Sequence, residues 1–301
     1  MELQNIIKCY LPKHDPLKHN TVIMSRLNKE QRTRVVAALV EGNSLRATAR
    51  MCSVAFNTVL KLVPEIGRAC TEYQDRVLRN LPCKRVQCDE IWSFVYAKQK
   101  NVPADLQGQF GYGDVWTWVA MDADTKLVPS WCVGTRDAET GYEFMHDLAR
   151  RLANRVQLTT DGHRVYLTAV ESAFGSEIDY AMLVKLYEGD SSSETRYSPA
   201  ECISCQRVAI AGRPDAKYIS TSYVERQNLA MRMNMRRFTR LTNAFSKKVE
   251  NHAAGVALHY MYYNFCRIHQ TLRVTPAMEA GVSDHAWNVE ELVELLEWNP
   301  N

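Results

Sequence analysis

The spacing of apolar residues changes at residue 84, and this change decides which folds are open to the chain. Between residues 28 and 66 the apolar side chains recur with the period of a helix, as at Val36 and Val40. From Lys84 to Val95 the period becomes two, which is typical of a strand. The chain therefore combines a helical N-terminal region with a following α/β region.

The N-terminal region is expected to hold three short helices. Asn28 can cap the first helix and Ser44 the second, and the segment AFNTVLKLV forms the third. A tight connection around Ser53 joins the last two helices, which is the outline of a helix-turn-helix. A plain three-helix bundle used for packing is the alternative.

We interpret residues 27–66 as an all-α helix-turn-helix domain that binds DNA. An N-terminal arm, residues 1–26, precedes it, and a helical linker, residues 67–83, follows it. The exposed face of the third helix is the face expected to reach base edges. Its candidate DNA-binding residues are Asn57, Thr58 and Lys61.

Residues 84–275 alternate between strand and helix patterns. A hairpin turn at residues 122–125 separates two strands, and Pro129 indicates that the second lies at a sheet edge or carries a bulge. The later elements follow in the order helix, strand, helix, strand, helix and helix, at about residues 138–153, 156–160, 164–173, 208–212, 222–237 and 245–265. This order predicts an α/β fold in which helices flank a mixed sheet, as in the ribonuclease H architecture. Two further segments are a polar insertion or mobile loop, residues 188–206, and a C-terminal helical tail, residues 276–301.

Three carboxylates stand where such a fold presents functional groups. Asp89 lies inside the first strand, Asp161 at the end of a later strand, and Glu225 in the first turn of a basic helix. Mg²⁺ prefers oxygen ligands, and two such ions together activate an attacking oxygen and stabilise a leaving one in a phosphodiester displacement. These three acids are therefore the candidate catalytic and metal-binding residues, with two Mg²⁺ ions per site and Mn²⁺ as a substitute.

Each acid also has a simpler interpretation. Asp89 is one polar residue of an alternating strand, and Asp161 precedes a glycine in a common turn pair. Glu225 fits a capping box that begins at Ser222.

Positive charge gathers around Glu225. Residues 206–248 contain ten Lys or Arg side chains and two acids. A lone acid in a basic helix that faces phosphates suits a DNA-cutting site, whereas a solvated charged face is the alternative. The residues expected to bind DNA in this region are Arg226, Asn228, Arg232, Arg236, Arg237, Arg240, Lys247 and Lys248.

The composition argues against several other classes of protein. Apolar residues make up 46% and charged residues 24% of the chain, which is typical of a globular protein and not of a disordered or fibrous one. Nine irregularly spaced cysteines, with a single Cys-x-x-Cys pair at 202–205, favour reduced thiols in a cytosolic protein. No apolar run reaches the roughly 18 residues of a membrane helix. We expect a cytoplasmic, nucleoid-associated protein with no membrane contact.

Four blocks of the sequence resemble the transposases of IS1-type insertion sequences, within the DDE superfamily. These blocks are CDEIWSFV (88–95), TTDG (159–162), SYVERQNLAMRMNMRRFTRLTNAFSKK (222–248) and YYNFCRIHQTLRVTPAM (262–278). The resemblance implies a ribonuclease H-like catalytic domain and an N-terminal DNA-binding region. It also implies an Asp-Asp-Glu triad that binds two Mg²⁺, and the triad falls on Asp89, Asp161 and Glu225.

Two features depart from the family pattern. The best-known members carry an N-terminal zinc finger, whereas residues 1–66 of this chain hold only Cys9 and Cys52. The interval between Asp161 and Glu225 is longer than in the shortest versions of the family, and the polar stretch 188–206 is a candidate for the inserted residues. If the compact spacing of the family held instead, Glu188 would be the rival third acid.

The expected function is that of an insertion-sequence DNA transposase, which cuts at the element ends and joins the 3′-hydroxyl to target DNA. The expected partners are double-stranded DNA, as terminal inverted repeats and as target, and further copies of the chain in a homodimer or larger synaptic assembly. Two alternatives stay open: a helix-turn-helix regulator with a relic catalytic domain, and a ribonuclease H-like nuclease that cuts without joining.

Overall fold

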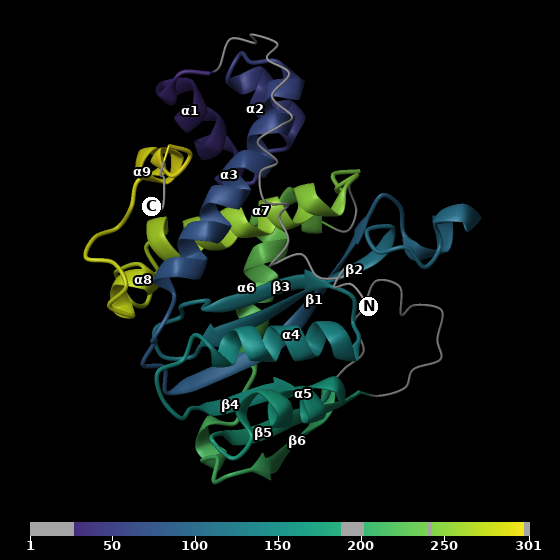
Figure 1. Cartoon of the computed structure of the whole chain (residues 1–301), viewed down its shortest axis with the longest axis vertical. Coiled ribbons are helices and arrows are strands. Elements are labelled where there is room, and N and C mark those ends of the chain that lie inside the picture. Colours follow the sequence, from purple (N-terminus) through teal and green to yellow (C-terminus); the bar gives the residue numbers. More distant parts are fainter. Residues whose placement is uncertain (1–26, 188–201, 240–242, 298–301) are drawn as a thin grey trace.

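The computed structural model describes residues 27–187, 202–239 and 243–297 (Figure 1). The expected N-terminal arm, the rival acid Glu188 and the basic residue Arg240 lie outside the described residues. Within the described ranges, no helix is both long enough and apolar enough to cross a bilayer.

The N-terminal helices are α1 (Lys29–Val40), α2 (Leu45–Met51) and α3 (Phe56–Val77). Asn28 caps α1 through a capping box with Gln31, and the Ser44 side chain accepts a hydrogen bond from the backbone N–H of Ala47 at the start of α2. Both helix starts agree with the sequence. The third helix is longer than expected, because α3 runs for 22 residues and continues without a break into residues 67–83, the segment expected to be a helical linker. Its apolar face is buried along this whole length, so nothing ends the helix at residue 66.

Helix α3 joins the N-terminal helices to the rest of the molecule by crossing α7 (Val249–Met261). Gly67 makes this crossing possible, since a Cβ there would lie 2.5 Å from the Cβ of Ala254. Near the end of α3, Arg151 bonds the Asp75 carboxylate at 2.6 Å and the Leu78 carbonyl at 3.2 Å. The N-terminal helices are therefore packed against the α/β region along α3.

A six-stranded mixed sheet forms the centre of the α/β region. The strands are β1 (Arg85–Val95), β2 (Gly113–Asp122), β3 (Ser130–Gly134), β4 (Gln157–Asp161), β5 (Asp179–Tyr187) and β6 (Cys202–Ala211). Their order is β3-β2-β1-β4-β5-β6; β1, β2 and β3 pair antiparallel, β4 and β5 continue parallel to β1, and β6 returns antiparallel. This is the ribonuclease H-like arrangement expected from the sequence, with β3 at an edge as Pro129 indicated.

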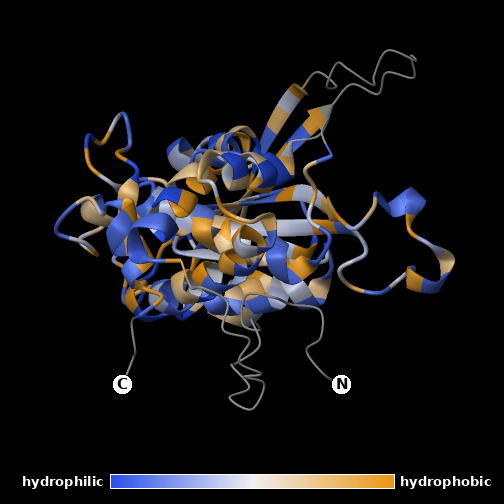
Figure 2. Cartoon of the chain, turned by 90° about the horizontal axis from the view of Figure 1, so that it is seen from above, coloured by the Kyte–Doolittle hydropathy of each residue, from blue (hydrophilic) through white to orange (hydrophobic). Residues whose placement is uncertain are grey.

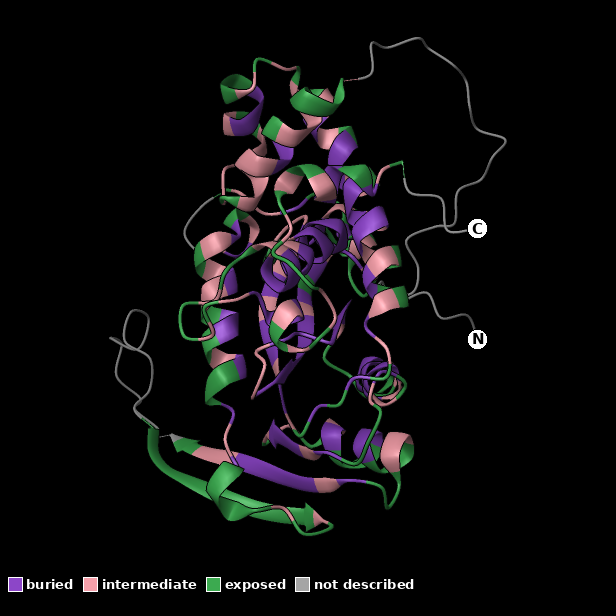
Figure 3. Ribbon diagram, turned by 90° about the vertical axis from the view of Figure 1, so that its left-hand side faces the viewer, coloured by how far each residue is buried: buried purple, intermediate pink, exposed green. Residues whose placement is uncertain are grey.

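The last two strands differ from the expectation. Strand β5 was not predicted, because Tyr180, Ala181, Met182 and Leu183 are all buried and such a run lacks the alternation that marks a strand. Strand β6 was predicted only for residues 208–212. It begins at Cys202, inside the polar stretch interpreted as an insertion, and is exposed along its length at the sheet edge (Figure 3). Backbone bonds to β5, rather than buried side chains, hold it in place.

Helices cover both faces of the sheet. On one face lie α4 (Ala138–Ala149) and α5 (Val165–Phe174), where the Trp118 ring contacts Phe144 and Tyr166 at centroid distances of 5.9 and 5.3 Å. On the other face lie α6 (Ser222–Asn234) and α7.

Short elements complete the described chain. The loop between β1 and β2 carries the 3₁₀ turns η1 (Gln99–Asn101) and η2 (Ala104–Leu106) and projects from the body of the molecule (Figure 2). The remaining elements are η4 (Ala216–Tyr218), η5 (Arg236–Phe238), η6, a π-turn (Tyr262–Cys266), α8 (Pro276–Glu279) and α9 (Val289–Glu294). Within the tail, α9 packs against α1, and Lys29 pairs with Glu290 and Glu294 at 3.0 and 2.7 Å.

Candidate active site

A pocket of about 870 Å³ opens where β4 ends beside β1, with α6 along one wall. The pairing between β1 and β4 stops at Cys88 and Thr160, and the segment before α7 next bonds β1 at Val95, through Ser246. Between these two points β1 has no strand partner on this side in the described chain. The backbone edge of β1 just beyond Asp89 is therefore not covered by a neighbouring strand, and the pocket lies at this edge.

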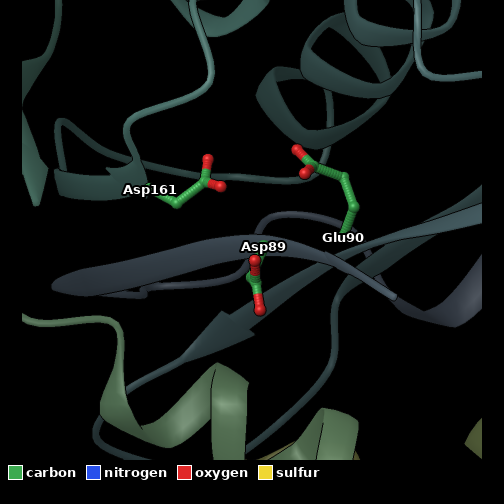
Figure 4. A group of neighbouring side chains, drawn as sticks. All are labelled: Asp89, Glu90 and Asp161. Carbon is green, nitrogen blue, oxygen red and sulfur yellow. The ribbon is translucent and has the colours of Figure 1, made fainter. Parts of the chain in front are cut away.

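Asp89 and Asp161 meet in this pocket. One carboxylate oxygen from each, together with one from Glu90, lies within 4.8 Å of the others. Figure 4 shows Asp89 on one side of the β1 ribbon and Glu90 and Asp161 on the other. The sequence predicted the proximity of the two aspartates, but it missed Glu90.

Glu90 was overlooked because it directly follows Asp89, and successive strand residues point to opposite faces. Its long side chain reaches the end of β4, where Arg136 pairs with both carboxylates, at 3.3 Å from Glu90 Oε2 and 3.8 Å from Asp161 Oδ2. One signal was available, because Glu90 shares a strand face with Trp92 and Phe94, and a carboxylate on an aromatic face requires a partner.

Burial and mutual repulsion favour the neutral forms of these acids. Burial, followed by the charge of Asp161, raises the pKa of Asp89 to about 6 and that of Glu90 to about 8. Burial likewise raises the pKa of Asp161. A cation placed among the three carboxylates would offset both effects.

Glu225 lines the same pocket from the first turn of α6 but stands outside the close group. Its carboxylate pairs with Lys185 of β5 and accepts a hydrogen bond from the Thr221 hydroxyl. The alternative interpretation of Glu225, a capping box that begins at Ser222, was wrong, because Thr221 is the N-cap of α6 and its side chain makes no capping bond. After burial, the charge of Glu225 is among the causes that raise the pKa values of Asp89 and Asp161.

Two of the expected DNA-binding residues are part of the pocket wall. Asn228 is buried, and its Nδ2 donates a hydrogen bond of 2.9 Å to Asp89 Oδ2. Its Oδ1 atom is buried without a hydrogen-bond partner in the described chain. Arg232, one turn further along α6, also lines the pocket.

The other expected DNA-binding residues lie outside the pocket. On α3, Asn57 and Lys61 are exposed and Thr58 is half-buried, and Arg226 is exposed on α6. A second groove, of about 680 Å³, separates the N-terminal helices from α7. Its basic lining residues are Arg46, Arg236, Arg237, Lys247 and Lys248.

Arg237 differs from its neighbours because its guanidinium is used inside the protein. Its Nη1 donates to Ser246 Oγ at 2.8 Å and to the Asn251 carbonyl at 2.5 Å. Burial lowers its pKa to about 10. These bonds hold the segment before α7 against β1, so Arg237 has a structural contact in addition to the DNA contact expected for it.

The donor set in the pocket suits a hard divalent cation. It offers carboxylate oxygens from Asp89, Asp161 and Glu90, with Glu225 on the facing wall and the buried, unpaired Oδ1 of Asn228 beside them. Mg²⁺ and Mn²⁺ bind oxygen ligands of this kind and usually keep sites for water and phosphate. The residues present therefore fit the ion implied by the sequence.

Comparisons with known proteins give limited matches. No protein-family model and no curated protein sequence matches the chain. Among solved structures, a piggyBac transposase synaptic complex with hairpin DNA has 10% identity and a TM-score of 0.42, over 95% of this chain and 73% of that chain. A Mos1 transposase paired-end complex with left transposon end has 13% identity and a TM-score of 0.19, over 52% of this chain and 59% of that chain. The Mos1 strand transfer complex has 13% identity and a TM-score of 0.24, over 80% of this chain and 78% of that chain. At these scores, no correspondence of residues follows from the matches.

Proposed function

We propose that this protein is a metal-dependent DNA transposase of an insertion sequence. The observation that carries the proposal is the meeting of Asp89 and Asp161 in one pocket, with Glu225 on a basic helix across from them. Residues 72 positions apart form this pocket only because β1 and β4 are neighbours in the sheet. The resemblance of the same sequence blocks to IS1-type transposases supports the same assignment.

In this proposal Asp89, Asp161 and Glu225 hold the divalent ions, and Asn228 orients the Asp89 carboxylate through its hydrogen bond. When bound, such ions activate an attacking oxygen and stabilise the leaving oxygen of a phosphodiester. Arg136, Lys185 and Arg232 line the pocket and supply positive charge for the phosphate that lies there. The side chains of the protein thus position the DNA strand and balance the negative charge of its phosphate.

DNA is the proposed partner of the wider basic surface. The exposed residues Arg236, Lys247 and Lys248 flank the groove beside α3, and Asn57 and Lys61 lie on α3 itself. In the proposal, α3 reads the terminal inverted repeat while the basic residues contact phosphates. Because two element ends must be held together, a homodimer or larger assembly is proposed as the active form.

A salt titration tests the phosphate contacts. Lys248→Ala should weaken duplex binding and lower the slope of log K against log salt by about 1, because one phosphate contact is lost. Lys29→Ala is the matched control, since that lysine pairs with Glu290 and Glu294 on the tail. An unchanged slope for Lys248→Ala would remove this residue from the DNA surface.

Product analysis separates the proposal from its two alternatives. The protein is incubated with target DNA, Mg²⁺ or Mn²⁺, and a donor plasmid that carries the DNA found on both sides of the gene that encodes the protein. The proposal expects strand-joined products that disappear in Asp161→Asn. Cut but unjoined products would favour a nuclease. Sequence-specific binding with no metal-dependent products would favour a regulator.

A further inference from the structure

A row of partly exposed aromatic side chains begins beside the carboxylate pocket. We call Trp92 and Phe94 of β1, Trp116 of β2 and Phe245 of the segment before α7 the aromatic strip. Ring centroids lie 5.9 Å apart for Trp92 and Phe94, and 4.9 Å apart for Phe94 and Phe245. Trp116 packs partly against the core, whereas Trp92, Phe94 and Phe245 are not among the described residues that do so. Three of the four rings therefore contact one another more than the protein interior.

The strip shares the strand face of Glu90. Glu90, Trp92 and Phe94 alternate along β1 and so point to the same side, and Trp116 lies directly opposite Trp92. The pairing of β3 ends at Trp116 and Gly134, and α4 begins only at Ala138. The outer part of the β1–β2 ribbon consequently extends past the cover that α4 gives to the sheet, as Figure 1 shows.

Cations stack on both ends of the strip. The Arg136 guanidinium lies 4.7 Å from the centre of the Trp116 ring while it also pairs with Glu90. The Lys247 ammonium lies 4.7 Å from the centre of the Phe245 ring. Asp114, opposite Phe94, adds one exposed carboxylate to this face. Rings with cations beside them suit a ligand that has both flat faces and phosphates.

The strip also connects two openings of the molecule. Arg136 lines the carboxylate pocket, and Phe245 and Lys247 line the groove beside the N-terminal helices. At about 3.3 Å per strand residue, Glu90 and Phe94 are about 13 Å apart along β1. Stacked bases are spaced about 3.4 Å apart, so the strip has room for a few of them.

We propose that the aromatic strip binds unpaired DNA bases next to the phosphodiester held in the carboxylate pocket. This proposal rests on the proposed function, because it assigns the strip to the strand that the pocket would act on. The bases must be unpaired, since the ring faces of paired bases are covered by their neighbours in the duplex. Stacking on Trp92 and Phe94 would hold the bases of the separated DNA strand, while Arg136 and Lys247 contact its phosphates.

Binding in EDTA tests the strip separately from any metal-dependent chemistry. Fluorescence anisotropy compares a labelled short oligothymidylate with a labelled duplex of equal length. Wild-type protein should bind the single strand through the strip, and Trp92→Leu or Phe94→Leu should weaken this binding by about 5- to 150-fold, with little change for the duplex. Trp92→Phe keeps a ring and should keep most of the affinity. Tyr142→Leu is the matched control, because this tyrosine is an exposed aromatic residue of α4 whose ring contacts His146, which is not part of the strip.

Two results would overturn the proposal. One is single-strand binding that Trp92→Leu, Phe94→Leu and Phe245→Leu all leave unchanged, in variants that melt like the wild type. The other is loss of self-association in Trp92→Leu without loss of oligonucleotide binding, which would make a second copy of the chain the occupant of the strip. Mn²⁺-dependent nicking of supercoiled plasmid is measured in parallel. If nicking occurs and the strip variants bind normally, this inference fails alone; if the strip binds single strands and no nicking occurs, the proposed function fails alone.

Discussion

Asn228 Nδ2 donates a hydrogen bond of 2.9 Å to Asp89 Oδ2, and this bond ties the basic helix α6 to the central strand β1. The two residues are 139 positions apart. The bond fixes the orientation of the Asp89 carboxylate and partly offsets the rise of its pKa, which burial and the charge of Asp161 still bring to about 6. The same contact places Glu225, one turn earlier on α6, in the wall of the pocket.

Removing this bond should weaken metal binding. Asn228→Ala is expected to lower Mn²⁺ affinity by about 10- to 100-fold, the usual effect of losing a group that orients a metal ligand. The loss should be largest below pH 6, because the pKa of Asp89 rises further without the bond. Isothermal titration calorimetry with Mn²⁺ at several pH values measures this loss of affinity. The exposed neighbour Arg226 provides the control variant Arg226→Ala, and equal affinities for the two variants would contradict the role of Asn228.

Glu90 should make the metal-free protein less stable as pH rises. Its pKa is raised from 4.5 to about 8 in the folded state, so the folded protein keeps a proton that the unfolded chain has lost between these values. The free energy of unfolding therefore falls with increasing pH across this window. Glu90→Gln should flatten the fall and stabilise the protein near pH 8, by about 1.4 kcal/mol for each unit of the raised pKa. Urea unfolding in EDTA measures this, and a fall of the same steepness in Glu90→Gln would exclude Glu90 as its source.

Glu225 and Glu90 should differ in their effect on strand cleavage. Glu225→Gln is expected to lower the rate by about 10²- to 10³-fold, because a carboxylate proposed to hold a divalent ion at the reacting phosphate is lost. Glu90→Gln should have a smaller effect, since its side chain is only 1% exposed and is held by Arg136. Plasmid nicking with Mn²⁺ gives both rates. A larger loss in Glu90→Gln would make Glu90 the third acid of the site.

The buried ion pair of Arg151 should be essential for the junction between α3 and α4. Arg151 bonds Asp147 twice at 2.9 Å, and both side chains are buried. Arg151→Met should lower the free energy of unfolding by about 3–5 kcal/mol, because it leaves the buried Asp147 carboxylate without its positively charged partner and with the Ser130 hydroxyl as a neutral donor. The control is Arg155→Met, which breaks the more exposed pair with Asp179 and should cost much less. Similar losses in both variants would contradict this account.

The sequence predicted the fold where its pattern is local. Capping residues located the starts of α1 and α2, and the period of two located β1. Strand β5 was not predicted because residues 180–183 are all buried, so its apolar residues do not alternate with polar ones. The first half of β6, residues 202–207, was not predicted because neither of its faces is buried. The length of α3 depends on its contact with α7, far along the chain, which no local pattern reveals.

The candidate site was predictable in part for the same reason. Asp89 and Asp161 follow from strand positions and from the rule that functional groups gather at strand ends. Glu90 joins them through the length of its side chain and the position of Arg136, and neither is visible in the spacing of acids. Asn228 was expected to touch DNA, yet it bonds Asp89, because the face that α6 turns toward the sheet is decided by packing.

The most direct test of the central claim is an anomalous-scattering map from crystals soaked in Mn²⁺. If the proposed site is correct, a Mn²⁺ peak is bound by Asp89 and Asp161, with the Glu225 carboxylate turned toward it and away from Lys185. Absence of the peak in Asp161→Asn crystals is the control. A map of the wild-type protein without manganese between Asp89 and Asp161, at a concentration that supports DNA cleavage, would contradict the account.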